Sequence, residues 1–221
     1  MDKISLDKVK NHPLVASFVE AANTYLGAIG YTEHGFRHVN LVSSVSQHIL
    51  GYLGYPEPLP ELAGIAGYLH DIGNVINRND HGHSGALIAM YILEDMGAEP
   101  MDVANVISAI GNHEEQTGDP VSPLSAALIL ADKSDVHRSR VRNPNMISFD
   151  IHDRVNYAAE RGFLRVDAAK RIISLELTID TKISQVLEYF EIFLPRMIMC
   201  RRAAKFLNCE FNLEINETKL L

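Results

Sequence analysis

The sequence predicts a mainly α-helical fold with a small C-terminal extension that mixes helix and strand. Apolar residues recur at helical spacing through most of residues 11–140, and Asn, Ser or Pro residues mark several helix starts. After Asn143-Pro144-Asn145 this pattern changes, and apolar and polar residues alternate between residues 170 and 180. Such alternation is typical of a strand with one buried face. We therefore expect a helical domain over residues 1–143 and an α+β extension with antiparallel strands over residues 144–221.

The helical domain should contain a series of helices joined by Gly, Pro and polar turns. The first begins at Asn11-His12-Pro13, where Asn can cap the helix and Pro fits the first turn. The third is rich in Ala and Gly, which allows close packing against a neighbouring helix. The expected ranges are about 11–30, 34–53, 61–71, 83–96, 101–113 and 124–140.

The extension is expected to contain two strands around a long helix. Residues 170–180 and 210–216 alternate with period two and predict the strands. An amphipathic helix is expected over about residues 181–207, kinked or broken by Pro195. An exposed last strand could pair with a second copy, so we expect a structural or dimerising role for the extension and consider a homodimer.

Composition restricts the classes of function. The 221-residue chain is 47% hydrophobic and 22% charged, as is typical of a globular protein. Its formal net charge of −8 argues against sequence-independent nucleic-acid binding, which needs a basic surface. The N-terminus lacks the apolar segment of a signal peptide, and no apolar run approaches the roughly 20 residues that span a bilayer. We expect a cytoplasmic protein with no membrane partner, in which Cys200 and Cys209 are reduced thiols.

Histidine and aspartate residues at helix ends predict a metal site. Of ten histidines, eight lie between residues 34 and 137. His70 and Asp71 end the third expected helix, and Asp132 follows six apolar residues in the sixth. An ionised carboxylate buried there without a partner would cost several kcal/mol, and a metal ion is the simplest partner. The candidate ligands are His38, His70, Asp71, His81, His113 and Asp132.

Each candidate ligand also has an ordinary structural interpretation. A single buried His is more often a hydrogen-bonded core residue, Asp132 could pair with Lys133 or Arg138, and Asp71 could be a solvated helix-end residue. We prefer the metal site because the six residues occur together at helix ends. Imidazoles and carboxylates suit two divalent transition-metal ions (Fe, Mn, Zn, Ni or Co), which at about 3.5–4 Å apart can bind a phosphate and activate a bridging water. His83 stays open between a ligand and a residue that supports one.

The order of these motifs resembles that of the HD-domain metal-dependent phosphohydrolases. The resemblance covers about residues 34–140 and implies an HD-type helical bundle in which Asp71 bridges two metals, as in the dinuclear subgroup. That subgroup includes diadenosine tetraphosphate hydrolases and cyclic-dinucleotide phosphodiesterases. The Gly-Tyr-Pro signature of the latter is absent after His113, which argues against cyclic dinucleotides. The matching segments are His38, His70-Asp71-Ile72-Gly73, His81 with Gly85-Ala86, His113 after Val106 and Ile110, and Leu130-Ala131-Asp132-Lys133.

The resemblance also implies a reaction. A metal-activated hydroxide would cleave a phosphate ester or anhydride of a small molecule, with a nucleotide as the expected substrate. His34 and His38 share one helix face. By similarity to cyclic-nucleotide phosphodiesterases, His38 would bind metal and His34 would protonate the leaving group, although His34 as the ligand, or without a role, stays open. Lys133 is expected to hold the phosphate, and Arg138 and Arg78 are further expected substrate contacts.

Two other functions fit the same residues. One is a non-catalytic nucleotide-sensing HD module whose extension passes on the signal. The other is an HD-type di-iron oxygenase. Turnover of a nucleotide panel separates the sensor from the hydrolase, and oxygen consumption identifies the oxygenase.

Overall fold

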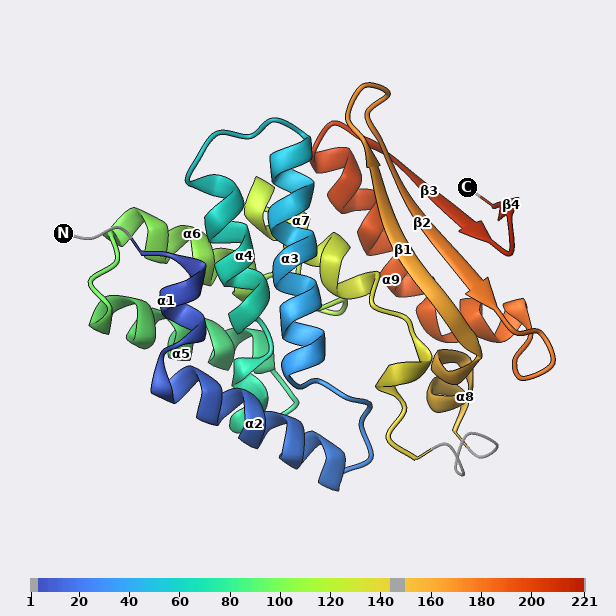
Figure 1. Ribbon diagram of the computed structural model, residues 1–221, viewed down its shortest axis with the longest axis horizontal. Helices are drawn as coiled ribbons and strands as arrows, with labels where there is room; N and C mark the ends of the chain where they lie inside the picture. The colour runs from blue at the N-terminus through green and yellow to red at the C-terminus, as the bar shows by residue number, and fades with distance from the viewer. Residues whose placement is uncertain (1–3, 144–149, 221) are drawn as a thin grey trace.

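The helical part of the molecule forms a bundle around two central helices. The computed structural model describes residues 4–143 and 150–220, so the domain boundary expected at 143/144 lies at the edge of a segment outside the described residues. Helices α3 and α4 pack side by side, with α7 packed against both of them (Figure 1). The elements are α1 (Leu6–Lys10), α2 (Pro13–Ala28), α3 (Phe36–Tyr52), α4 (Leu59–Leu69), η1 (Ile72–Val75), α5 (His81–Asp95), α6 (Pro100–Gly111), α7 (Pro123–Lys133) and η2 (Arg138–Arg140).

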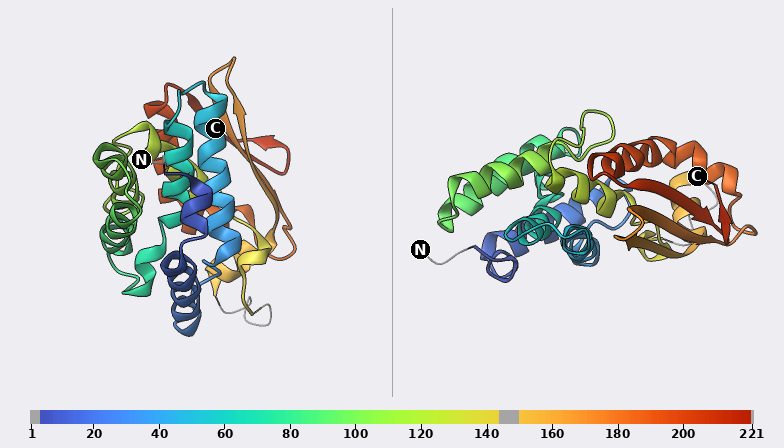
Figure 2. Two further views of the ribbon diagram at one scale, coloured as in Figure 1. Left: turned by 60° about the vertical axis from the view of Figure 1, so that its left-hand side comes forward. Right: turned by 90° about the horizontal axis from the view of Figure 1, so that it is seen from above.

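The C-terminal part is a small mixed sheet with a covering helix. Strands follow the order β1-β2-β3-β4, and α9 packs against α7 on one side and against β3 on the other. Seen from above, the sheet and α9 form one end of the molecule and helices α5 and α6 the other (Figure 2). The elements are α8 (Ile151–Ala158), β1 (Ala159–Asp167), β2 (Ile172–Ile179), α9 (Val186–Phe206), β3 (Glu210–Ile215) and β4 (Thr218–Lys219).

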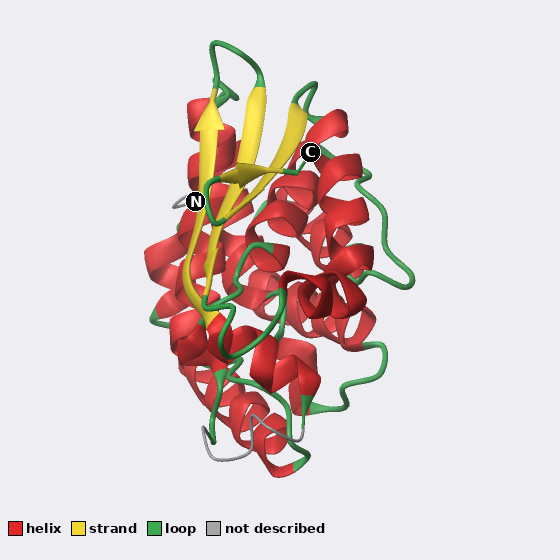
Figure 3. Ribbon diagram, turned by 90° about the vertical axis from the view of Figure 1, so that its right-hand side faces the viewer, coloured by secondary structure: helices red, strands yellow, loops and turns green. Residues whose placement is uncertain are grey.

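The mainly α fold with an α+β extension is therefore confirmed. In β2, Ile173, Leu175, Leu177 and Ile179 are buried, as the alternating pattern predicts. The apolar residues that pair with them in β3 are also buried, and one hydrophobic cluster joins both sets to the helical core. Figure 3 shows the strands on one side of the molecule, backed by helices. None of the helices in the described parts of the chain is long and apolar enough to cross a membrane.

The pairing of the two central strands of the sheet differs from the expectation. β1 pairs with β2 and β3 with β4 in antiparallel fashion, but β2 and β3 run parallel, with Leu175 opposite Leu213. Parallel neighbours need a crossover, and α9 provides it. The antiparallel extension predicted from the sequence is thus a mixed sheet.

Two breaker signals in the extension do not break the elements that contain them. β1 runs through Arg161-Gly162, which has the composition of a turn. Gly162 is needed there for close approach, because a Cβ would lie 2.8 Å from the Val136 carbonyl oxygen. Helix α9 continues through Pro195, with buried Phe193 and Met197 on either side of it. Burial of the flanking apolar residues outweighs the local cost of the proline.

Other helix bounds also differ from the predicted ones. The sixth predicted helix ends at Lys133 rather than near residue 140, and the short helix α1 was not predicted. After Lys133 the chain turns, and Asp135 and Arg140 become buried beside the start of α3. The polar contacts of Asp135 and Arg140 hold this segment in place of the further helical turns that were predicted.

Small residues allow α3 and α4 to approach closely. The Ser43 hydroxyl donates a hydrogen bond of 2.7 Å to the Gly64 carbonyl oxygen across this contact. A Cβ on Gly67 would lie 2.8 Å from Ser43 Cα and 2.9 Å from the Val42 carbonyl oxygen. The backbones therefore meet at Gly67, as the Ala and Gly content of this helix suggested.

Replacing Gly67 with Ala should destabilise the protein by about 1–3 kcal/mol, because the added methyl group forces two backbones apart. Gly51→Ala in α3 is the control, since a Cβ there meets nothing within 4 Å and Ala favours helix by about 1 kcal/mol. Urea unfolding midpoints measure both variants. Equal stability of the two variants would contradict the close contact at Gly67.

Candidate metal centre

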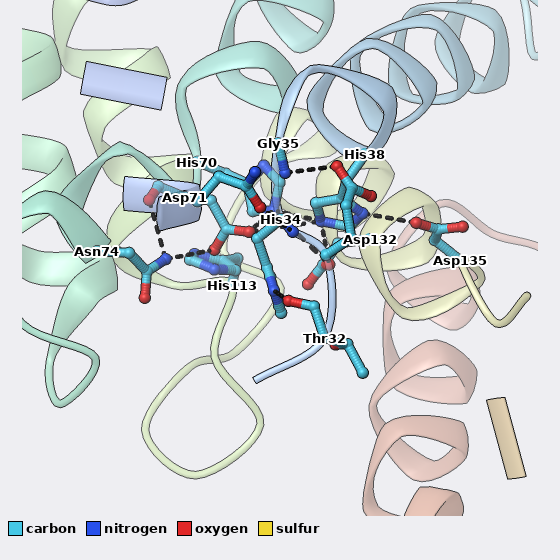
Figure 4. Close-up of polar contacts among 12 residues, drawn as sticks. Thr32, His34, Gly35, His38, His70, Asp71, Asn74, His113, Asp132 and Asp135 are labelled. Carbon is cyan, nitrogen blue, oxygen red and sulfur yellow. Dashed lines mark hydrogen bonds and ion pairs between the residues drawn. The ribbon is translucent and has the colours of Figure 1, made fainter. Parts of the chain in front are cut away.

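Five helix ends bring the six predicted ligands to one buried place. The local sequence puts each side chain at the first or last turn of a helix, where the helices converge. Figure 4 shows His38, His70, Asp71, His113 and Asp132 directed toward one another. The six residues are His38 at the start of α3, His70 and Asp71 after α4, His81 at the start of α5, His113 after α6 and Asp132 near the end of α7.

The Asp71 carboxylate lies between two pairs of imidazoles. Its Oδ2 lies 3.5 Å from His38 Nε2 and 3.4 Å from His70 Nε2, whereas its Oδ1 lies 3.3 Å from His81 Nε2. The His81 and His113 Nε2 atoms are 3.1 Å apart. Asp71 is only 4% exposed, and its Oδ2 has no hydrogen-bond partner among the described residues. Each oxygen of one buried carboxylate thus faces a different imidazole pair.

Asp132 lies beside the imidazole pair formed by His38 and His70. Its Oδ1 lies 3.4 Å from His38 Nε2 and 3.6 Å from His70 Nε2. Ligand atoms within 4.8 Å of one another form three sets among the described residues. These sets are His38, His70 and Asp71; His70, His113 and Asp132; and Asp71, His81 and His113.

The four imidazoles are oriented by acceptors on their outer side. His70 Nδ1 lies 2.9 Å from the Gly67 carbonyl oxygen and His113 Nδ1 lies 2.6 Å from that of Ile110. With Nδ1 as the donor, the Nε2 atoms point inward and offer lone pairs to the centre. Inward lone pairs only 3.1–3.3 Å apart repel one another unless a proton or a cation lies between them. The donor set therefore fits a divalent transition metal.

Two carboxylates near the centre were not identified as supporting groups from the sequence. Asp135 Oδ2 accepts a hydrogen bond of 2.6 Å from His38 Nδ1 and is itself paired with Arg37 at 2.7 Å. Glu114 Oε1 lies 3.0 Å from His81 Nδ1. Such partners orient ligating imidazoles and increase their basicity. The one signal in the sequence is that Asp135 follows the candidate ligand Asp132 by three residues.

The sequence analysis also missed Asn74 and Glu115. Asn74 donates a hydrogen bond of 2.9 Å to Asp71 Oδ1 from the turn after α4. Glu115 Oε1 lies 3.3 Å from Lys133 Nζ. Asn74 lies in η1 and Glu115 in the loop after α6, and the sequence pattern does not show that these two segments approach the centre.

The carboxylates of the centre are held ionised. Burial by itself would raise the pKa of Asp71, but His70, His38 and His81 hold that pKa well below its usual range. Burial likewise opposes the ionised form of Asp132, and the neighbouring Lys133 ammonium and His38 keep its pKa low. The ionised carboxylates of Asp71 and Asp132 thus provide the negative charge that a bound cation requires.

The surroundings shift the pKa values of the imidazoles in opposite directions. Burial disfavours protonated His38, yet hydrogen bonds to Asp132, Asp135 and Asp71 raise its pKa to about 10. Burial also disfavours protonated His81, but Asp71 and Glu114 raise its pKa to about 9. Burial and then the charge of His70 lower the pKa of His113 to about 3. Without a metal, protons on His38 and His81 balance the carboxylates.

The remaining predicted residues are distributed unevenly around the centre. His34 lies beside His38, with ring centroids 5.5 Å apart, and is absent from the three ligand sets. Lys133 Nζ contacts Asp132 Oδ2 at 2.6 Å. Arg78 is 3.9 Å from Asp71 Oδ1. Arg138 instead faces the extension, where it pairs with Glu160 at 3.0 Å.

The histidines outside the centre have ordinary surroundings. The His83 side chain is 63% exposed and lies outside the ligand sets found among the described residues. His48 stacks on Tyr52, and His137 lies 2.8 Å from the Ser139 hydroxyl. His48 and His137 therefore make contacts outside the metal centre.

Metal binding at pH 7 should release protons. Because the pKa values of His38 (about 10) and His81 (about 9) are raised above 7, both rings are protonated without metal and must lose a proton to bind one. Apparent Mn²⁺ affinity should therefore rise as the pH increases toward 9. Calorimetry in two buffers of different protonation enthalpy measures the released protons. Binding that releases none and does not depend on pH would contradict this assignment.

The segment of the chain that holds this centre matches a known domain family. A family model described as "HD domain" matches residues 35–137. The chain is 27% identical over 212 residues to Uncharacterized protein MJ1020 of Methanocaldococcus jannaschii, covering 84% of this chain and 81% of that protein. It is also similar to a solved structure described as a predicted HD superfamily hydrolase from an uncultured Thermotogales bacterium, with a TM-score of 0.45, 25% identity, and coverage of 59% of this chain and 73% of that one. The matched segment contains all six candidate ligands, and residues 35–137 form an HD domain.

Proposed function

We propose that the protein is a metal-dependent phosphohydrolase that cleaves a phosphate ester or anhydride of a small molecule, with a nucleotide as the expected substrate. The observation that carries the proposal is the position of Asp71, whose two carboxylate oxygens face two different imidazole pairs. This arrangement supports two divalent ions that share one bridging carboxylate. The ions would supply positive charge to phosphate oxygens and lower the pKa of a bound water.

Cationic side chains around the centre support a phosphate substrate. Lys133 approaches from the Asp132 side, and Arg78 from the side of Asp71 and His81. The Arg78 side chain is 26% exposed, so it can reach both the centre and an incoming ligand. Arg138 does not enter the proposal, because its guanidinium is held at the extension.

An aromatic surface beside Arg78 supports a nucleotide. The Arg78 guanidinium lies over the Tyr31 ring, 5.4 Å from its centroid, and Tyr31 is 42% exposed. Exposed aromatic rings next to a phosphate-binding cation are suited to stacking a base. A nucleotide could therefore place its phosphate at the centre and its base near Tyr31.

His34 is the proposed proton donor to the leaving group. Its Nδ1 lies 2.7 Å from the Thr32 carbonyl oxygen, which fixes the tautomer and leaves Nε2 as the reactive nitrogen. Burial and the charge of Arg140 lower the pKa of His34, so the ring is neutral without ligand. An anionic phosphate beside the ring would raise this pKa, and His34 would then carry the proton that it donates.

A phosphate-release screen of nucleotides with Mn²⁺ or Fe²⁺ tests the proposed function. The wild-type protein should release phosphate or a nucleoside phosphate, and Asp71→Ala should lose both the bound metal and this activity. Asp80→Asn is the matched control, because the Asp80 side chain is 78% exposed and Asn tolerates its left-handed backbone. Metal-dependent nucleotide binding without turnover would favour a sensor instead, and an Asp71→Ala protein with full metal content and turnover would refute the proposal.

His34→Asn should lower kcat by about 10²- to 10⁴-fold while metal content stays at the wild-type level. His83→Asn should change neither quantity, since the exposed His83 ring makes no contact with the centre. Steady-state kinetics and elemental analysis of both variants measure these effects. If His34→Asn loses metal, then His34 is a ligand and the assignment of the proton donor is wrong.

A further inference from the structure

A row of alternating charges joins the candidate metal centre to helix α9 of the extension. Lys133 Nζ lies 2.6 Å from Asp132 Oδ2 and 3.3 Å from Glu115 Oε1. The same Glu115 oxygen lies 2.9 Å from Arg196 Nε. The exposed fractions of the Lys133 and Glu115 side chains are only 7% and 22%. Water screens these charges poorly, so each one changes the energy of the next.

Two cations share one carboxylate in this row. Asp132 and Glu115 together balance Lys133 and Arg196. When the Asp132 carboxylate binds a metal ion, Lys133, Glu115 and Arg196 together retain one net positive charge. Without Arg196, Glu115 would neutralise Lys133 alone, and no net positive charge would remain beside the centre.

The position of Arg196 is itself fixed by packing. Its guanidinium lies over the Phe193 ring, 4.6 Å from the centroid, and Phe193 is buried in the core that joins the extension to α7. A stacked, ion-paired guanidinium holds its direction well. The extension therefore holds the positive charge of Arg196 at a fixed position beside the loop that follows α6.

We propose that Arg196 is a positioning residue that occupies Glu115 and so keeps the Lys133 ammonium available for the substrate phosphate. The inference rests on the proposed function, because it concerns the cation that would bind the phosphate. It gives the extension a role at the site of the HD domain, in addition to packing against it.

A purely structural tie between α9 and this loop is the competing explanation. The chain offers a matched control, since Arg202 of α9 forms an ion pair with Asp119 of the same loop. Arg202 lies outside the row of charges that includes Lys133. A structural tie predicts similar effects for both arginines, whereas the proposal predicts an effect that depends on the charge at position 196.

Binding of inorganic phosphate to the Mn²⁺-loaded full-length protein tests the inference by calorimetry. Arg196→Gln should weaken phosphate binding roughly 10-fold, whereas Arg196→Lys and Arg202→Gln should bind within about 2-fold of wild type. Metal content and thermal midpoint of each variant provide readouts independent of activity and should stay at the wild-type values.

A double-mutant cycle with Glu115 decides the mechanism. In a Glu115→Gln background Lys133 no longer faces the carboxylate with which Arg196 pairs, so Arg196→Gln should no longer weaken phosphate binding. Wild-type affinity in Arg196→Gln, or the same loss with and without Glu115, would overturn the inference while leaving the proposed function in place. If the wild-type protein binds no phosphate with Mn²⁺ present, then the proposed function fails, and the inference fails with it.

Discussion

The burial of the Asp71 carboxylate is the constraint on which the rest of the centre depends. A carboxylate that is 4% exposed needs strong compensation, and imidazoles from three helix ends together with Asn74 surround it. The chain must turn tightly after α4 to place it. Gly73 permits this turn, because a Cβ there would lie 2.0 Å from the His81 carbonyl oxygen. The close approach of this turn to α5 therefore brings Asp71 and His81 together.

Hydrogen bonds on the outer side of the imidazoles order the candidate metal centre. Each inward Nε2 is matched by an outward Nδ1 that meets a carbonyl or carboxylate oxygen, such as Asp135 beside His38. Asp135 in turn joins the start of α3 to the segment after α7 through Arg37 and Arg140. Farther out, α9 contacts the loop after α6 through ion pairs. The extension is thus part of the electrostatic surroundings of the centre.

The sequence predicted the elements whose signals are local. The six candidate ligands are His or Asp residues at the ends of periodic segments, and the structure brings all six together. The roles of Asp135 and Glu114 could not be predicted, because they depend on which way an imidazole faces. Strand β1 was missed since Gly162 resembles a turn residue, whereas its function is close approach to Val136. The parallel pairing of β2 and β3 depends on the crossover by α9, which alternation alone does not reveal.

Anomalous diffraction from crystals of the Mn²⁺-loaded protein tests the central claim most directly. The account predicts two peaks, one beside His38, His70 and Asp132 and the other beside His81 and His113, with Asp71 in contact with both. A single peak, or two peaks of which only one contacts Asp71, would contradict the bridging role of this carboxylate.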